Sequence, residues 1–145
     1  MQTITGFFKY YSKPLVTNLL NDEKRAVNVI DISDASLASA SPDVCSLRLD
    51  QCIKQAEADV SLYLASPDFS DTAILNMVND FAMEYVYTRI GVVPVPDSIK
   101  DTCDKHRKNL LGINQQTIDA LSLTQSASTS IFDCAIEETV LFDYD

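Results

Sequence analysis

The amino-acid sequence predicts a mainly α-helical fold: a small antiparallel bundle of three core helices, with extended arms at both ends. Two observations predict it. Within residues 43–112, apolar side chains recur three and four positions apart, the spacing that places them on one face of a helix. The breaks between these stretches are short, which favours antiparallel neighbouring helices. We therefore divide the chain into an N-terminal arm (1–42), a helical core (43–112) and an acidic C-terminal arm (113–145).

The first core helix is predicted to begin at Ser41-Pro42-Asp43. Ser41 can accept hydrogen bonds from the free N–H groups at the helix start, and Pro42 suits the first helical position because its missing N–H is no loss there. The opposite side of this helix is polar, so we expect one wet face. The apolar face consists of Cys45, Leu49, Cys52, Ile53, Ala56, Val60, Tyr63 and Leu64.

The second core helix is predicted to be capped by Ser70 or Asp71, to run to Arg89 or Ile90, and to end at Gly91. It is apolar around most of its girth, so it must be covered on more than one side, by the bundle or partly by a neighbouring subunit. Its charged residues argue against a membrane span. The remaining polar strip is Asn76, Asp80, Glu84 and Thr88.

The third core helix is predicted to begin near Pro96-Asp97 and to end at Gly112, because glycine is common just past the end of a helix. Its apolar stripe is narrow, and the remaining positions are charged and expected to face water. The stripe consists of Ile99, Cys103, His106 and Leu110.

The N-terminal arm opens with a cluster of aromatic residues in the segment Phe7-Phe8-Lys9-Tyr10-Tyr11. Two interpretations are open: the cluster covers the chain's own core, or it anchors a neighbouring subunit, since aromatic side chains provide large contact area at low entropic cost. A short helix is expected after Pro14, and a short strand is allowed within 27–32. The candidate partner-binding residues are Phe7, Phe8, Tyr10 and Tyr11.

The C-terminal arm carries six acidic residues and no lysine or arginine. A serine- and threonine-rich spacer (124–130) precedes two apolar stretches that resemble strands, and such an arm either folds back on the bundle or adds a strand to another chain. Further candidate partner-binding residues are Ile131, Phe132, Val140, Leu141 and Phe142.

The net charge of −10 disfavours a protein that grips duplex DNA, but it suits one that surrounds DNA without binding it. No segment resembles a signal peptide or membrane span, which predicts a soluble intracellular protein. The four cysteines include no CxxC pair, so we expect reduced thiols. No catalytic residue, metal ligand set or cofactor site is predicted; Cys103 and His106, one turn apart, are the only imaginable metal or nucleophile pair.

The segment from Leu47 to Gly112 resembles the head–tail connector (adaptor) proteins of tailed bacteriophages. The stretch from Leu49 to Leu64, with Val60, Tyr63 and Leu64 in a pattern close to Ile-x-x-Tyr-Leu, is similar to the family's first core helix. The apolar helix that ends in Glu84-Tyr85-Val86-Tyr87-Thr88-Arg89 resembles the second. Val95-Pro96-Asp97-Ser98-Ile99-Lys100, followed by Leu110-Leu111-Gly112, resembles the third.

This resemblance implies a structural virion protein and no enzyme. Family members form a ring, usually of twelve copies, beneath the portal, where the ring extends the DNA channel and provides the platform for the tail. The implied partners are further copies of the chain, the portal protein and a tail or further ring protein. The implied location is the virion neck, after assembly in the host cytoplasm. Which arm would contact which neighbour is left open.

Two alternatives remain beside the connector. The first is another protein-interaction module, an acidic regulatory or chaperone-like helical bundle. The second is an enzyme or metal protein built around Cys103 and His106.

Overall fold

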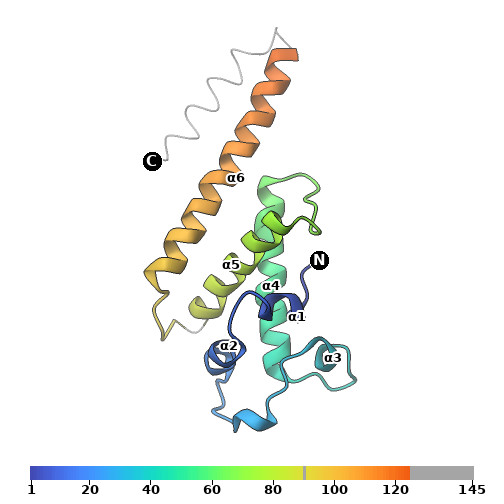
Figure 1. The fold of residues 1–145 in the computed structure, drawn as a ribbon, viewed down its shortest axis with the longest axis vertical. Coiled ribbons are helices and arrows are strands. Elements are labelled where there is room, and N and C mark those ends of the chain that lie inside the picture. The colour runs from blue at the N-terminus through green and yellow to red at the C-terminus, as the bar shows by residue number, and fades with distance from the viewer. Residues whose placement is uncertain (90, 125–145) are drawn as a thin grey trace. The chain divides into compact units, whose positions relative to one another are not determined.

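The computed structural model describes residues 1–89 and 91–124 of the chain, with side chains as far as Gly112. All regular structure in this described part is helical (Figure 1). The chain forms two compact units, Met1–Arg107 and Lys108–Asp145, which divide inside the last helix. The elements in chain order are α1 (Ile4–Phe8), α2 (Lys13–Leu20), the 3-10 helix η1 (Val27–Val29), α3 (Asp34–Leu37), α4 (Val44–Tyr63), α5 (Thr72–Thr88) and α6 (Asp97–Thr124).

Helices α4 and α5 form the centre of the first unit. They run in opposite directions and are joined by the short link 64–71 (Figure 1). Full burial of one large apolar side chain contributes about 1.5–3 kcal/mol, so this pair is the main source of stability. The fully or almost fully buried apolar side chains of the two helices are Cys45, Leu49, Cys52, Ile53, Ala56, Val60, Val78, Phe81, Ala82, Met83 and Val86.

The prediction that α5 is covered on more than one side is confirmed. Its buried residues include the polar Asn79 and Asp80, which are only 3% and 2% exposed. Buried polar groups need hydrogen-bond partners, because an unpaired one costs about 1–3 kcal/mol. Asp80 and Glu84 of the predicted polar strip, together with Asn79, are therefore places where other segments attach.

The ends of the core helices follow their capping residues. Asp71 caps α5, as predicted, by accepting a hydrogen bond from the Ala73 N–H at 2.8 Å. Gly91, with φ of +76°, follows the end of α5 in the left-handed region that glycine tolerates. The cap of α4 is Asp43 and not Ser41; its carboxylate accepts from the Cys45 N–H at 2.8 Å, so Pro42 stays outside the helix.

The prediction that Gly112 ends the third core helix is wrong. Helix α6 begins at Asp97, as predicted, but continues through Gly112 to Thr124. Glycine lowers the stability of a helix interior by only about 1 kcal/mol and does not force an end. No proline follows Gly112 in the sequence, so the helical hydrogen bonds can continue.

The prediction of an extended N-terminal arm is also wrong, although the short helix expected after Pro14 is confirmed as α2. Helices α1 and α3 pack on α4, and α2 packs on both α4 and α5. The reason is apolar burial: large side chains are spaced through residues 1–42, and an extended arm would leave them in water. The buried apolar side chains of this segment are Ile4, Phe7, Val16, Leu20 and Ile32.

The strand allowed within residues 27–32 is not formed; Val27–Val29 is a 3-10 helix with both valines exposed. The start of the predicted C-terminal arm, residues 113–124, is the end of α6. The predicted strands after residue 130 lie outside the described residues. Among the described helices, none has the length and apolarity needed to cross a lipid bilayer.

Candidate functional site

The aromatic cluster lies at the end of α1, which is held in place by its Thr3 cap. The Phe7 ring is completely buried and lies 5.8 Å from the Phe8 ring and 5.5 Å from the Tyr11 ring, measured between centroids. Phe7 therefore belongs to the chain's own core, and its proposed role as an exposed anchor is corrected. Phe8 and Tyr11 are half-buried, whereas Tyr10 is 46% exposed.

The Asp80 carboxylate of α5 is the polar centre beneath this cluster. The Tyr11 hydroxyl donates a hydrogen bond to Asp80 Oδ1 at 2.5 Å, and His106 Nε2 of α6 lies 2.6 Å from Asp80 Oδ2. The Cys103 thiol donates to the Asp80 backbone carbonyl at 3.3 Å. Asp80 thus joins the end of α1, α5 and the first turns of α6.

The protonation states of Cys103 and Tyr11 suit a structural role as hydrogen-bond donors. Burial raises the pKa of the Cys103 thiol to about 12, and burial with the hydrogen bond to Asp80 raises the pKa of Tyr11 far above its usual value. Both groups are therefore protonated donors near neutral pH, and the thiol lacks the thiolate form that a nucleophile needs. His106 Nδ1 is buried without a hydrogen-bond partner within the described part of the chain.

A second contact holds α6 one turn further along α5. Arg107 forms an ion pair with Glu84, and its guanidinium lies 5.2 Å from the centroid of the Phe81 ring. The rings of Phe81 and His106 also lie nearly perpendicular to each other, with 5.9 Å between their centroids. The first turns of α6 are therefore fixed to α5 mainly by polar and aromatic contacts.

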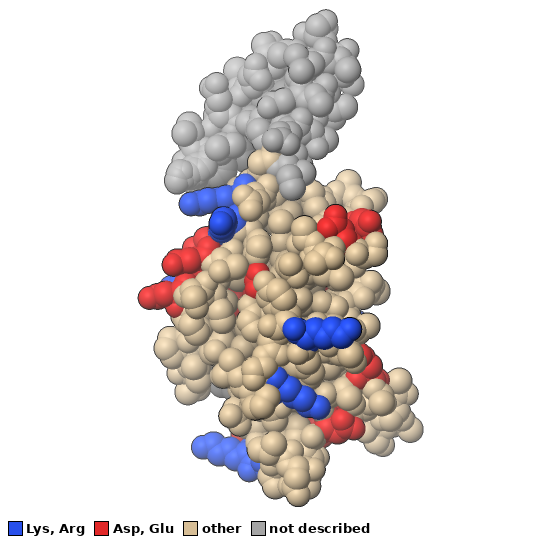
Figure 2. All heavy atoms as spheres, viewed as in Figure 1, with Lys and Arg blue, Asp and Glu red and all other residues tan. Residues whose placement is uncertain are grey.

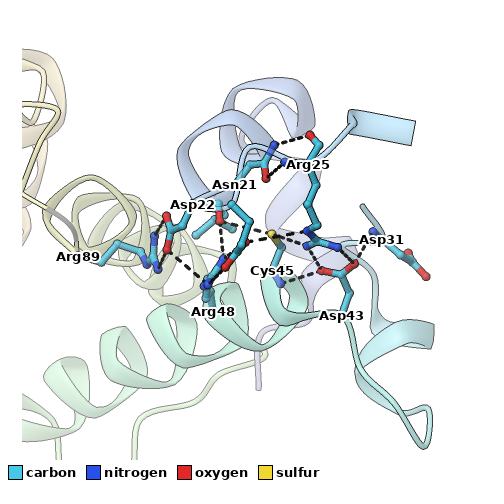
Figure 3. A network of polar contacts seen from close by, with 10 residues as sticks. Asn21, Asp22, Arg25, Asp31, Asp43, Cys45, Arg48 and Arg89 are labelled. Atoms are coloured by element: carbon cyan, nitrogen blue, oxygen red, sulfur yellow. Dashed lines mark hydrogen bonds and ion pairs between the residues drawn. The ribbon is translucent and has the colours of Figure 1, made fainter. Parts of the chain in front are cut away.

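An arginine–carboxylate network links the loop after α2 to the two central helices (Figure 3). Arg25 donates to both oxygens of Asp43, at 3.1 and 2.8 Å, and the Asp31 N–H donates to the same carboxylate at 3.2 Å. The Arg25 hydrogen bonds hold the pKa of Asp43 well below its usual range. Asn21 supports the loop through two hydrogen bonds with the Arg25 backbone, at 2.8 and 2.9 Å.

The other half of the network reaches the end of α5. Arg89 donates to both oxygens of Asp22, at 3.0 and 2.7 Å, and its hydrogen bonds lower the Asp22 pKa. Arg48 of α4 donates to Glu23 at 3.0 and 2.5 Å and to the Leu20 carbonyl at 3.0 Å. Residues 21–25 are thereby clamped between α4 and α5 (Figure 3).

The first residues of the chain are also bonded to the core. The Gln2 N–H donates to Glu57 Oε2 at 2.8 Å, and the Gln2 side-chain amide donates to Asn79 Oδ1 at 2.7 Å. Glu57 and Asn79 are both buried. These hydrogen bonds satisfy polar groups of α4 and α5 that would otherwise be left unpaired.

The sequence pattern indicated the aromatic cluster and the Cys103–His106 pair, but it did not indicate the carboxylates and arginines that connect the segments. Asp80, Asp43 and the three arginines of the network were missed as connecting residues. One signal was present: an acid such as Asp80 within an apolar helix must be paired if it is buried. The C-terminal candidates Ile131, Phe132, Val140, Leu141 and Phe142 lie outside the described residues.

Neither the charges on the drawn face nor the clustering of possible metal ligands among the described residues indicates a binding site. On the face drawn in Figure 2, basic and acidic side chains are interspersed, and no broad area carries one sign. Among the residues that the structure describes, no group of three or more histidine, cysteine or acidic side chains could hold a metal ion.

No protein-family model matches the sequence, and comparisons with curated proteins and with solved structures find no significant match.

Proposed function

We propose that this chain is a structural protein of the head–tail junction of a tailed bacteriophage, a connector that forms a ring below the portal, extends the DNA channel and joins portal to tail. The observation that carries the proposal is the succession of α4, α5 and α6, with short links, over the segment whose sequence resembles the connector family. Val60 and Tyr63 fall in the last turn of α4, and Pro96-Asp97 precedes and opens α6.

The charge distribution also supports a channel wall that does not grip DNA. Residues 1–112 carry 15 acidic and 11 basic residues, and the remaining six acids lie in residues 113–145. Several of the basic residues are already paired with carboxylates: Arg25 with Asp43, Arg48 with Glu23, Arg89 with Asp22 and Arg107 with Glu84. These four arginines are therefore neutralised within the chain, and the acidic excess of the whole sequence disfavours a tight grip on phosphates.

The mechanism that we propose is assembly through complementary surfaces, with no chemical step and no cofactor. Bundles pack side by side in the ring, and the interface energy is concentrated in a few aromatic and aliphatic side chains. Phe8, Tyr10 and Tyr11 remain the N-terminal candidates, since Phe7 is buried within the chain.

Native mass spectrometry of the purified chain, alone and with the portal protein encoded near it, tests the proposal. We expect a ring, or a complex with the portal in a fixed ratio. A chain that stays monomeric in both samples would rule the connector out.

A second candidate is an acidic protein-interaction module of regulatory or chaperone-like type. The observation that favours it is the closed packing of residues 1–42 on α4 and α5, which makes the first unit self-sufficient. A stable monomer or dimer that binds a soluble host protein, and not the portal, would support this candidate.

A further inference from the structure

We infer that a surface between α1 and α2, with two lysines that are unpaired among the described residues, is the docking site for the acidic C-terminal segment of a second copy of this chain. The surface between α1 and α2, called the N-terminal patch, consists of Phe8, Lys9, Tyr10, Lys13 and Leu15. Its proposed ligand, called the C-terminal segment, consists of residues 130–145. The inference rests on the proposed function, because it describes a contact between subunits of the proposed ring. The contact itself can be tested without the portal protein.

The N-terminal patch combines exposed apolar and basic side chains. Tyr10 and Leu15 are 46% and 41% exposed, and Lys9 and Lys13 also lie on the surface. The Lys13 ammonium lies 5.7 Å from the centroid of the Phe8 ring, so this lysine borders an aromatic side chain of the patch.

The charge of this patch is uncompensated at the surface. Residues 1–21 contain no aspartate or glutamate. Neither lysine forms an ion pair with another residue in the described part of the chain. The acid that approaches the tyrosines, Asp80, is 2% exposed and already bonded to Tyr11 and His106. Asp34, the acid bonded to the start of α1, is held by the Ile4 and Thr5 N–H groups and the Thr5 hydroxyl. An incoming carboxylate would thus meet two lysine ammonium groups that form no ion pair within the described residues.

The C-terminal segment has the complementary composition. It carries five acidic residues and no basic one, and its large apolar residues alternate with the acids in two groups. An apolar, acidic segment fits a surface of aromatic rings bordered by lysines, because rings offer contact area and ammonium groups offer charge pairs. The apolar residues are Ile131, Phe132, Ile136, Val140, Leu141, Phe142 and Tyr144.

The second copy is the occupant that accounts for both surfaces at once. The segment lies beyond the first unit in the sequence, after α6, and carries the charge that the patch of another copy lacks. A patch on one copy that receives a different segment of the next is a heterologous contact, and repeated heterologous contacts form a ring when the rotation between copies closes. The two ends of the chain thereby become the two halves of one interface.

Photo-cross-linking in the full-length chain tests the contact directly. The variant Phe142→p-benzoyl-phenylalanine is prepared in ¹⁵N-labelled and unlabelled forms, which are mixed and irradiated. We expect cross-links from position 142 to residues 8–15 that join a labelled chain to an unlabelled one. Cross-links confined to single chains, links to other regions, or no links would each overturn the inference.

Charge exchange provides a second test. The variant Lys9→Glu/Lys13→Glu should weaken self-association about tenfold at low salt, as should Glu137→Lys/Glu138→Lys, since each removes two ion pairs. Combining all four substitutions should restore association. The matched control Lys100→Glu/Lys105→Glu changes the same charge on α6 and should leave association unchanged.

The outcomes separate this inference from the proposed function. Portal binding without the cross-link between copies would refute the docking site and leave the connector intact. The cross-link between copies in a chain that forms no ring and does not bind the portal would support the docking site and refute the connector. Circular dichroism of each variant establishes that it is folded before association is measured.

Discussion

Two carboxylates, Asp80 and Asp43, connect distant parts of the chain in different ways. Asp80 is buried in the middle of α5 and is bonded to a phenol and an imidazole. Asp43 sits at the start of α4, where it receives a guanidinium and the backbone N–H groups of Asp31 and Cys45. The comparison shows two ways in which a carboxylate can connect distant segments. A buried carboxylate does so through the hydrogen bonds that it accepts, and one at a helix start does so through a permanently charged partner.

The difference predicts how each connection fails. A buried carboxylate without a permanent cation depends on every hydrogen bond it receives, because its desolvation is otherwise uncompensated. A carboxylate at a helix start, beside arginine, keeps its charge favourable down to low pH. The following substitutions separate these cases, from the largest expected effect to the smallest.

Asp80→Ala should lower the free energy of unfolding by about 3 kcal/mol, because it leaves the Tyr11 hydroxyl and His106 Nε2 buried without their acceptor. Urea unfolding followed by circular dichroism measures the change. The control Asp101→Ala removes an exposed acid of α6 and should change stability by less than about 0.5 kcal/mol. Equal effects for the two variants would contradict the role of Asp80 as the connecting residue.

Asp43→Ala should cost about 2 kcal/mol through loss of the helix cap and of the Arg25 pair. The pH dependence gives the sharper measurement. Since the folded-state pKa of Asp43 is depressed, its contribution is complete above about pH 4 and disappears as the pH falls through the folded-state pKa. Asp43→Asn, which keeps a capping side chain, should therefore lose stability less steeply between about pH 4 and pH 2 than the wild type. Parallel curves would refute this.

Tyr11→Phe should cost about 1 kcal/mol, the value of one hydrogen bond to Asp80, while the ring packing against Phe7 is kept. Tyr63→Phe is the matched control, since the Tyr63 hydroxyl makes no hydrogen bond within the described residues. Thermal unfolding of both variants compares them. A loss in Tyr63→Phe as large as that in Tyr11→Phe would mean that the Asp80 hydrogen bond adds nothing.

Lys54→Ala should have the smallest effect on stability of these variants. Lys54 pairs with Asp50 at 2.9 Å along α4, but its side chain is 64% exposed, so water and salt screen the attraction. The effect should vanish at high salt in urea unfolding. A loss as large as that of Tyr11→Phe that persists at high salt would show that exposure does not determine the strength of these pairs.

The helical core could be predicted because its signals are local. Apolar spacing marks α4 and α5, and Asp71 and Pro96-Asp97 lie within a turn of the helix that they start. The local signal at Gly112 is misleading, because glycine permits a helix to end but does not cause it to end.

The connections could not be predicted because their partners are far apart in sequence. Tyr11 and His106 lie 69 and 26 positions from Asp80. The spacing of residues within α5 indicates that Asp80 interrupts an apolar surface, but not which side chains reach it. The packing of residues 1–42 depends on the same tertiary information, and an aromatic cluster has the same local sequence whether it covers its own core or a neighbour.

Because three of the four cysteines are buried, the unmodified chain can be labelled selectively with a thiol reagent. Cys45, Cys52 and Cys103 are free but buried, and burial raises the pKa values of Cys52 and Cys103 to about 11 and 12, so these thiols resist alkylation in the folded state. The fourth, Cys134, falls between Phe132 and Ile136 in the C-terminal segment. A maleimide fluorophore that reacts rapidly with the native protein would therefore mark this segment without any substitution, and its emission would respond to docking.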